Sequence, residues 1–406
     1  MNVFDKIKDF KVVQETKALG LYPYFHALES KQDIEVTMEG HRKIMIGSNN
    51  YLGLTSDDRV IEAAVKAIKQ YGSGVSGSRF LNGTLSLHLE LERALADFLH
   101  KESCMVFSTG FSSNLGIIDG IAGRKDIIFC DRENHASIYD ATRLSLAQMV
   151  RYKHNDMEDL EEQLKKSPAS RGKLIVTDGV FSMTGAICKL PEIVALAKKY
   201  NARVMVDDAH GIGTIGPGGR GTAAHFGLEE DVDLIMGTFS KSLASLGGYL
   251  VASEEVVDFI RHKARSFIFS AAITPSNAAS AYEALKILQA EPNRVDDLLK
   301  ITAYMRDKLL EKKLHIYDGS IAPIIPVFTY TPLRTLVACK VLYQRGVYVN
   351  PVIPPATPEG QCLIRTSYTS THTKALMDEA ADIIAEVLHA LPHDDEALLA
   401  YVKEHV

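Results

Sequence analysis

The sequence predicts an α/β protein with a large domain on a mainly parallel sheet and a smaller α+β domain at its C-terminal end. The 406 residues are enough for two or three domains. Short runs that are apolar on both faces recur from about residue 104, and segments with helical spacing separate several of them. Such strands need helices to cover them, which is the arrangement of a parallel sheet in an α/β domain.

The expected elements begin with an arm and two helices. The first 50 residues combine an amphipathic start with a polar stretch over 30–42, and we expect them to lead into the body of the protein. Helical spacing over 57–71 and 84–100 predicts two helices, and Gly72 ends the first. Six apolar runs are then expected to be buried strands, at 104–108, 126–130, 173–177, 203–207, 233–237 and 248–252.

The pattern changes near residue 290. A helix is expected over 293–313, a strand over 323–330 and a long helix over 373–391. We therefore expect an arm over 1–50, a large α/β domain over 51–290 and a C-terminal α+β domain over 291–406.

Composition and charge exclude several classes of protein. Apolar residues make up 46% and charged residues 24% of the chain, which is typical of a globular protein. The net charge of −6 gives no bulk attraction to nucleic acid or to an anionic membrane, so we expect no nucleic-acid partner and at most peripheral membrane contact. We find no apolar run long enough to span a membrane and no apolar signal core near the N-terminus, and we expect a cytoplasmic protein. Five dispersed cysteines and the histidine spacing indicate neither a disulfide framework nor a metal site.

The segment 108–114, with sequence Ser-Thr-Gly-Phe-Ser-Ser-Asn, follows a predicted strand and opens a predicted helix. Gly110 permits a tight turn, and the first N–H groups of a helix point outward at the positive end of its dipole. This arrangement can hold a phosphate, although a plain strand–helix turn is equally compatible with the segment taken alone.

Other candidate residues follow the ends of predicted strands, where ligands bind in open α/β sheets. Asp207 could pair with a cationic ring nitrogen, and Lys241 lies among small hydroxyl residues where it could form a Schiff base. His135 follows another strand, and the guanidinium of Arg365 could clamp a carboxylate. Each of these residues alone could have an ordinary structural role at the protein surface or in the core. Together with the phosphate site expected at 108–114, they form the set of groups that catalysis by pyridoxal phosphate (PLP) requires.

Six motifs in order give the sequence a family resemblance. They are 48–54 (SNNYLGL), 108–111 (STGF), 134–137 (NHAS), 178–183 (DGVFSM), 206–211 (VDDAHG) and 238–241 (TFSK). Over about residues 21–389 the chain resembles the α-oxoamine synthases, PLP enzymes of fold type I, the aspartate aminotransferase type. Within that family it most resembles the soluble bacterial serine palmitoyltransferases, through residues 80–84 (FLNGT) and 237–244 (GTFSKSLA). Some of those enzymes carry an arginine where this chain has Ile353.

The resemblance implies roles for individual residues. Lys241 would carry PLP and act as a base, Asp207 would pair with the pyridine nitrogen, and His135 would stack on the ring. His210 and Ser182 would lie near the phenolic oxygen. The remaining implied residues are phosphate ligands (Gly110, Phe111, Thr238 and Ser240), substrate carboxylate ligands (Asn49 and Arg365) and a segment reaching the neighbouring subunit's phosphate in a homodimer (Ser270 and Ala271).

The implied reaction joins an amino acid, with serine favoured, to an acyl-CoA and releases CoA and CO2. With serine and palmitoyl-CoA the product would be 3-ketodihydrosphingosine, the first intermediate of sphingolipid synthesis. A sister enzyme using glycine with acetyl-CoA, or alanine with pimeloyl-CoA, stays open, as does a PLP aminotransferase. A subunit that has lost catalysis is a further alternative, and the presence of Lys241 argues against it.

Overall fold

The computed structural model describes residues 2–317 and 319–405 and divides into two compact units. One unit is Asn49–Leu299, and the other combines Met1–Ser48 with Lys300–Val406. Helix α12 (Asn293–Glu311) runs across the second division. The predicted domain ranges 1–50, 51–290 and 291–406 stay a prediction. A division by contacts does not show which parts of the chain fold independently, and independent folding is what defines a domain.

The unit Asn49–Leu299 is built on a seven-stranded sheet with the order β3-β9-β8-β7-β6-β4-β5. Neighbouring strands from β5 to β8 are parallel, whereas β9 is antiparallel to both β8 and β3. The expected fold class, with its mainly parallel sheet, is confirmed. The strands are β3 (Ser103–Phe107), β4 (Asp126–Asp131), β5 (Gln148–Tyr152), β6 (Gly172–Asp178), β7 (Arg203–Asp207), β8 (Leu234–Thr238) and β9 (Gly248–Ala252).

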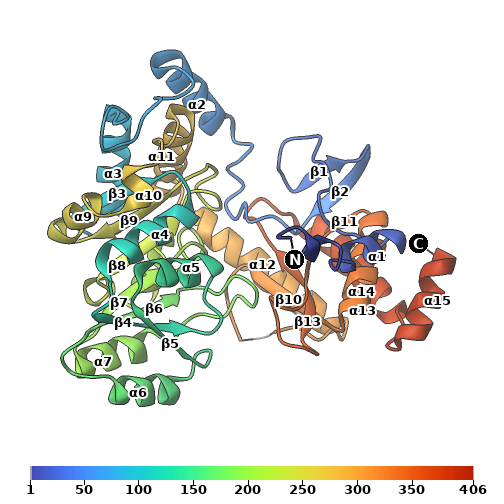
Figure 1. The fold of residues 1–406 in the computed structure, drawn as a ribbon. Helices are drawn as coiled ribbons and strands as arrows, with labels where there is room; N and C mark the ends of the chain where they lie inside the picture. Colours follow the sequence, from blue (N-terminus) through green and yellow to red (C-terminus); the bar gives the residue numbers. More distant parts are fainter. Residues whose placement is uncertain (1, 318, 406) are drawn as a thin grey trace. The chain divides into compact units, whose positions relative to one another are not determined.

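An apolar layer joins this sheet to four helices, α4 (Gly110–Ile121), α5 (Ala136–Ser145), α9 (Glu254–Arg261) and α10 (Arg265–Ile268). Figure 1 shows α4 and α5 lying over the strands. Alternate strand residues enter the layer, as period-two geometry requires. The other helices of this unit are α2 (Asp58–Tyr71), α3 (Ser86–Phe98), α6 (Met157–Lys166), α7 (Leu190–Tyr200), α8 (Thr222–His225) and α11 (Pro275–Ala290).

Helix α2 begins and ends where local chemistry predicts. The side chain of Asp57 caps its first turn by accepting the N–H of Arg59, at 3.0 Å. Gly72 follows the last helical residue with φ 84°, a conformation that favours glycine. The expected helix over 57–71 is therefore confirmed to within one residue.

The second unit contains two three-stranded sheets, β1-β2-β11 and β10-β13-β12. The hairpin of β1 and β2 lies partly in the stretch 30–42 that sequence reasoning assigned only to an arm. It was missed because His41 and Arg42 are exposed on β2 and leave a short apolar run. The elements are α1 (Val12–Ala18), β1 (Glu35–Met38), β2 (His41–Met45), β10 (Ile324–Tyr330), α13 (Pro332–Gln344), β11 (Val347–Tyr348), β12 (Asn350–Val352), β13 (Cys362–Ser367), α14 (Lys374–Ala390) and α15 (Asp395–His405).

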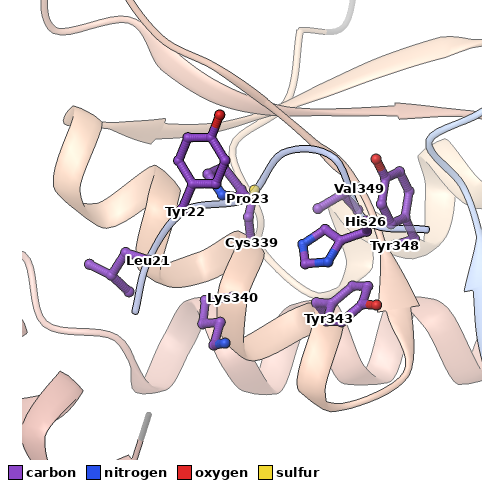
Figure 2. Close-up of a pocket in the computed structure, with 9 residues that line it drawn as sticks. All are labelled: Leu21, Tyr22, Pro23, His26, Cys339, Lys340, Tyr343, Tyr348 and Val349. Carbon is purple, nitrogen blue, oxygen red and sulfur yellow. The ribbon is translucent and has the colours of Figure 1, made fainter. Parts of the chain in front are cut away.

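A polar and aromatic contact anchors the segment around His26 to α13 (Figure 2). The ring of His26 stacks on Tyr343, with 4.1 Å between ring centroids. Glu39 accepts a hydrogen bond from the Tyr343 hydroxyl at 3.0 Å and lies 2.9 Å from Nδ1 of His26. Hydrogen bonds from His26 and Tyr343 lower the pKa of Glu39. The cavity beside these rings measures about 10 Å³, which is too small for an organic ligand.

Burial keeps the cysteines unreactive. All five are buried free thiols, and burial raises the pKa of Cys130 to about 12. Among the described residues, the helices include none that is both long enough and apolar enough to cross a membrane.

A buried ion pair ties the loop before α3 to the sheet. Both guanidinium nitrogens of Arg79 bond to the carboxylate of Glu92, at 2.8 and 3.0 Å. One carboxylate oxygen of Glu92 also accepts the backbone N–H of Val106 in β3, at 2.8 Å. Both side chains of the pair are nearly excluded from solvent, so either charge without its partner would be strongly destabilising.

We predict that Arg79→Met destabilises the protein by about 3–5 kcal/mol, because it leaves the charge of Glu92 buried without its partner. Thermal melting of the full chain measures the change. The matched control is Arg143→Met, which removes an ion pair with Asp140 whose side chains are 72% and 47% exposed. That control should change stability by less than about 1 kcal/mol. An equal fall in melting temperature for both variants would contradict the prediction.

Candidate functional site

Polar side chains gather where β6, β7 and β8 end. Val176 in β6 and Met205 in β7 face the apolar layer that contains α4. Because strand residues alternate between faces, Asp178, Asp207 and Thr238 at the strand ends face the same side. Asp178 and Asp207 are register partners in the parallel ladder. The sheet therefore brings two acids and a hydroxyl to one edge.

A cavity of about 260 Å³ opens at this edge. Its walls come from the ends of β6, β7 and β8, from the start of α4 and from the loops after β4 and β8. The lining residues are Thr109, Gly110, Phe111, Asn114, His135, Ser137, Asp178, Val180, Asp207, Ala209, His210, Met236, Thr238, Ser240, Lys241 and Leu246.

The N-terminus of α4 forms one wall. Thr109 caps the helix by accepting the N–H of Ser112 at 3.0 Å, while the Ser112 hydroxyl accepts the N–H of Thr109 at 3.1 Å. A Cβ on Gly110 would lie 2.8 Å from the Thr238 hydroxyl oxygen, so only glycine fits this approach without displacement. The first N–H groups of α4 have no acceptor inside the helix, and they create a site suited to an anion.

The loop after β8 adds hydroxyl groups and an amine. Thr238 is buried and donates its hydroxyl hydrogen to the carbonyl of Gly247 at 2.9 Å. The Ser240 hydroxyl lies 3.0 Å from that of Thr238, and the Ser240 N–H donates to the same oxygen at 3.3 Å. These bonds fix the loop that carries Lys241 into the cavity lining.

Asp207 is a buried carboxylate with polar support from α4. The side-chain amide of Asn114 donates to one of its oxygens at 2.7 Å, and the N–H of Ala209 donates to the other at 3.1 Å. The same amide nitrogen donates to the Ser137 hydroxyl at 2.8 Å. Both oxygens of Asp207 therefore have a hydrogen-bond donor in the buried site.

His135 is held to the end of β6 by its neighbours. Its backbone N–H donates to Asp178 at 3.2 Å, and the Asn134 side chain accepts the N–H of Asp178 at 3.0 Å. Burial lowers the pKa of His135; Lys241 acts in the same direction, and Asp207 opposes both. Burial and the charge of Asp207 raise the pKa of Asp178 well above its usual value. The site therefore combines a neutral imidazole with a carboxyl group that tends to keep its proton.

His210 lies just after β7 and contacts a tyrosine from the start of the same unit. The hydroxyl oxygen of Tyr51 is 2.7 Å from Nδ1 of His210, and both side chains are buried. The same hydroxyl donates to the side-chain oxygen of Asn49 at 3.2 Å. Asn49, Tyr51 and His210 thus form a short polar chain that ends at the cavity lining.

Eight of the residues expected from the sequence lie around this one cavity. They are Gly110, Phe111, His135, Asp207, His210, Thr238, Ser240 and Lys241.

The other expected residues lie outside the set that lines the cavity. Ser182 follows β6, and the carbonyl of Ala271 accepts the Ser108 hydroxyl at 2.5 Å, next to Ser270. Asn49 contacts Tyr51, as described. Arg365 is buried on β13 in the other unit, where it donates to the Ser367 hydroxyl at 3.2 Å.

Sequence reasoning gave no site role to Asn114, Asp178 or Tyr51. Asp178 carried the same signal as Asp207, an acid at the end of an apolar strand, and could have been found by it. Asn114 lies one helical turn after Gly110 and therefore on the same face of α4. Tyr51 had no comparable signal, because its partner His210 is distant in sequence.

The fold and this arrangement define a known class of protein. The chain belongs to the aminotransferase class I and II family, whose sequence model matches residues 41–384. The family resemblance and the fold class expected from the motifs are confirmed.

Particular members of known function are similar over nearly the whole chain. The chain is 50% identical to a serine palmitoyltransferase of Sphingobacterium spiritivorum over 383 residues, which cover 94% of this chain and 96% of that protein. A solved structure named as SPT with the PLP internal aldimine superposes with a TM-score of 0.93 at 35% identity, covering 96% of this chain and 99% of that one. An 8-amino-7-oxononanoate synthase of Bacillus velezensis is 42% identical over 380 residues, 94% of this chain and 95% of that protein.

We predict that His135 takes up a proton only below the usual histidine pKa of about 6.5, because burial disfavours the imidazolium. NMR titration of the histidine side chains measures this, with His135→Gln to assign the signal. His154 is the internal contrast. Its pKa is raised, since hydrogen bonding to Asp131 and the charges of Asp131 and Glu133 outweigh burial. A His135 midpoint at or above that of His154 would contradict the prediction.

Proposed function

We propose that this protein is a PLP-dependent acyltransferase that condenses L-serine with a long-chain acyl-CoA, palmitoyl-CoA in particular. The observation that carries the proposal is the gathering of Lys241, Asp207 and the α4 N-terminus around one cavity, in a chain 50% identical to a serine palmitoyltransferase. The relatives named as 8-amino-7-oxononanoate synthases supply the second candidate, a condensation of alanine with pimeloyl-CoA.

The residues of the cavity fit PLP at each of its polar groups. The N–H groups of Gly110 and Phe111 suit the phosphate, together with the hydroxyls of Thr238 and Ser240. The carboxylate of Asp207 suits the protonated ring nitrogen, and the neutral imidazole of His135 suits the ring face without charge repulsion. We assign His210 and Ser182 to the phenolic oxygen, and Asn49 and Arg365 to the substrate carboxylate.

When bound, PLP supplies an electron sink for negative charge on the α-carbon of an amino acid. Asp207 would hold the ring nitrogen in its protonated form, which deepens that sink. Nζ of Lys241 would take the proton from the α-carbon of serine and return one at the end of the reaction. The N-terminus of α4 would hold the phosphate in place.

The overall reaction balances with one proton consumed. A bond forms between the serine α-carbon and the thioester carbonyl carbon, and the C–S bond breaks as CoA leaves. The serine carboxylate then departs as CO2, and a proton replaces it on the α-carbon. The product is 3-ketodihydrosphingosine when the acyl chain is palmitoyl.

We also propose a homodimer in which Ser270 and Ala271 reach the neighbouring subunit's phosphate site. Phe269 beside them is 77% exposed, and Leu81 is 78% exposed on a loop whose Gly77 bonds to Ala272. Exposed apolar side chains of this size support a protein–protein contact. We predict that sedimentation of the loaded protein gives twice the chain mass of 44.7 kDa; a monomer would overturn the shared site.

The proposed activity predicts CoA release from serine with palmitoyl-CoA and from no other tested pair. The assay crosses serine, alanine and glycine with acetyl-, pimeloyl- and palmitoyl-CoA on PLP-loaded protein and measures free thiol. Release with alanine and pimeloyl-CoA, or with glycine and acetyl-CoA, would instead assign a sister activity. Amino-group transfer without CoA release would assign an aminotransferase.

Lys241→Ala is the decisive variant in the same assay. It removes the amine that moves the proton, so turnover and the bound-cofactor absorbance should both be lost. Lys189→Ala changes an exposed lysine outside the cavity lining and should match the unaltered protein. Normal turnover by the Lys241→Ala protein would contradict the proposal.

A further inference from the structure

The hydroxyl of Tyr51 lies between a residue assigned to the substrate and a residue assigned to the cofactor. It is 2.7 Å from Nδ1 of His210 and 3.2 Å from Oδ1 of Asn49. Tyr51 is fully excluded from solvent, and His210 is only 6% exposed. The three side chains belong to the same compact unit, so their geometry is internal to it.

The contact with Tyr51 holds one edge of the His210 ring. The 2.7 Å between the hydroxyl oxygen and Nδ1 is a hydrogen-bond distance whichever of the two atoms carries the hydrogen. The hydroxyl also donates to Oδ1 of Asn49 at 3.2 Å, so the Tyr51 side chain is itself held in place.

Holding Nδ1 has a consequence for the other ring nitrogen. The imidazole ring is rigid, so a contact that fixes Nδ1 also restricts the direction in which Nε2 points. His210 lines the cavity, and the orientation of its ring therefore sets which atom it offers to a ligand there.

We propose that Tyr51 is a positioning residue that fixes the orientation of the His210 ring for hydrogen bonding to the cofactor. The inference rests on the proposed function, in which His210 meets the phenolic oxygen of PLP. Tyr51 acts through His210 and makes no contact with the reacting atoms in this role.

The test compares two buried tyrosines changed to phenylalanine in the full-length, PLP-loaded protein. Tyr51→Phe removes only the hydroxyl that contacts His210. Tyr249→Phe is the matched control, because Tyr249 is equally buried and its hydroxyl has no hydrogen-bond partner among the described residues. Both changes keep the ring, so a loss confined to Tyr51→Phe cannot come from ring packing.

Nitrogen NMR of labelled histidine is the first measurement, with His210→Asn to assign the signal. Tyr51→Phe should shift the nitrogen signals of His210, because its Nδ1 loses a hydrogen-bond partner, and Tyr249→Phe should leave them unchanged. The proposal is overturned if Tyr51→Phe and the unaltered protein give the same His210 signals.

Kinetics and absorbance are the second measurement. Tyr51→Phe should lower kcat about tenfold, the size of effect expected from the loss of one hydrogen bond, with KM for serine nearly unchanged. It should also shift the pH dependence of the cofactor absorbance, while Tyr249→Phe should change neither. An equal loss in both variants would overturn the inference. Failure of the unaltered protein to bind PLP would overturn the proposed function, and the NMR comparison would still decide whether Tyr51 holds His210.

Discussion

The burial of the Asp207 carboxylate at the end of β7 is the constraint around which this site is organised. A charge taken out of water is costly unless polar groups replace its hydration. Asn114 from α4 and the backbone of Ala209 supply those groups. Asn114 must approach the strand ends closely to reach Asp207, and the absence of side chains at Gly110 and Gly248 permits this, because a Cβ on Gly248 would lie 2.9 Å from the α-carbon of Gly110. The position of the N-terminus of α4 is therefore tied to the hydrogen bonds that the buried carboxylate of Asp207 needs.

Strands apolar on both faces can be recognised from sequence because burial on both sides dictates their composition. That is why β3, β4 and β6 to β9 were expected within one or two residues of their observed bounds. Strand β5 was missed because it carries Gln148 and Arg151, which are exposed and interrupt its apolar run. The strand at the other edge of the sheet, β3, is buried over 104–107 and therefore has a recognisable pattern.

Site residues that directly follow an apolar strand could be predicted from the sequence. Contacts that depend on how strands align, or on segments far apart in the chain, could not. Asp207 and Lys241 follow apolar runs, a signal that one sequence carries. The pairing of Asp178 with Asp207 depends on how β6 and β7 align, and strands buried on both faces lack the polar–apolar alternation that would fix their alignment. The contact of Tyr51 with His210 likewise joins segments that only the folded chain brings together.

The charged and polar groups in the cavity favour one orientation of a bound ligand. Asp178 is the acid that tends to keep its proton, since burial and Asp207 both raise its pKa, and His135 tends to be neutral because burial lowers its pKa. Asp207 has the better hydrogen-bond donors of the two acids. The N-terminus of α4 attracts an anion in the same cavity. A ligand with a phosphate at one end and a cationic ring nitrogen at the other would match both groups, with its phosphate toward α4 and its nitrogen toward Asp207. The electrostatics therefore support PLP on grounds that are separate from the likeness to known enzymes.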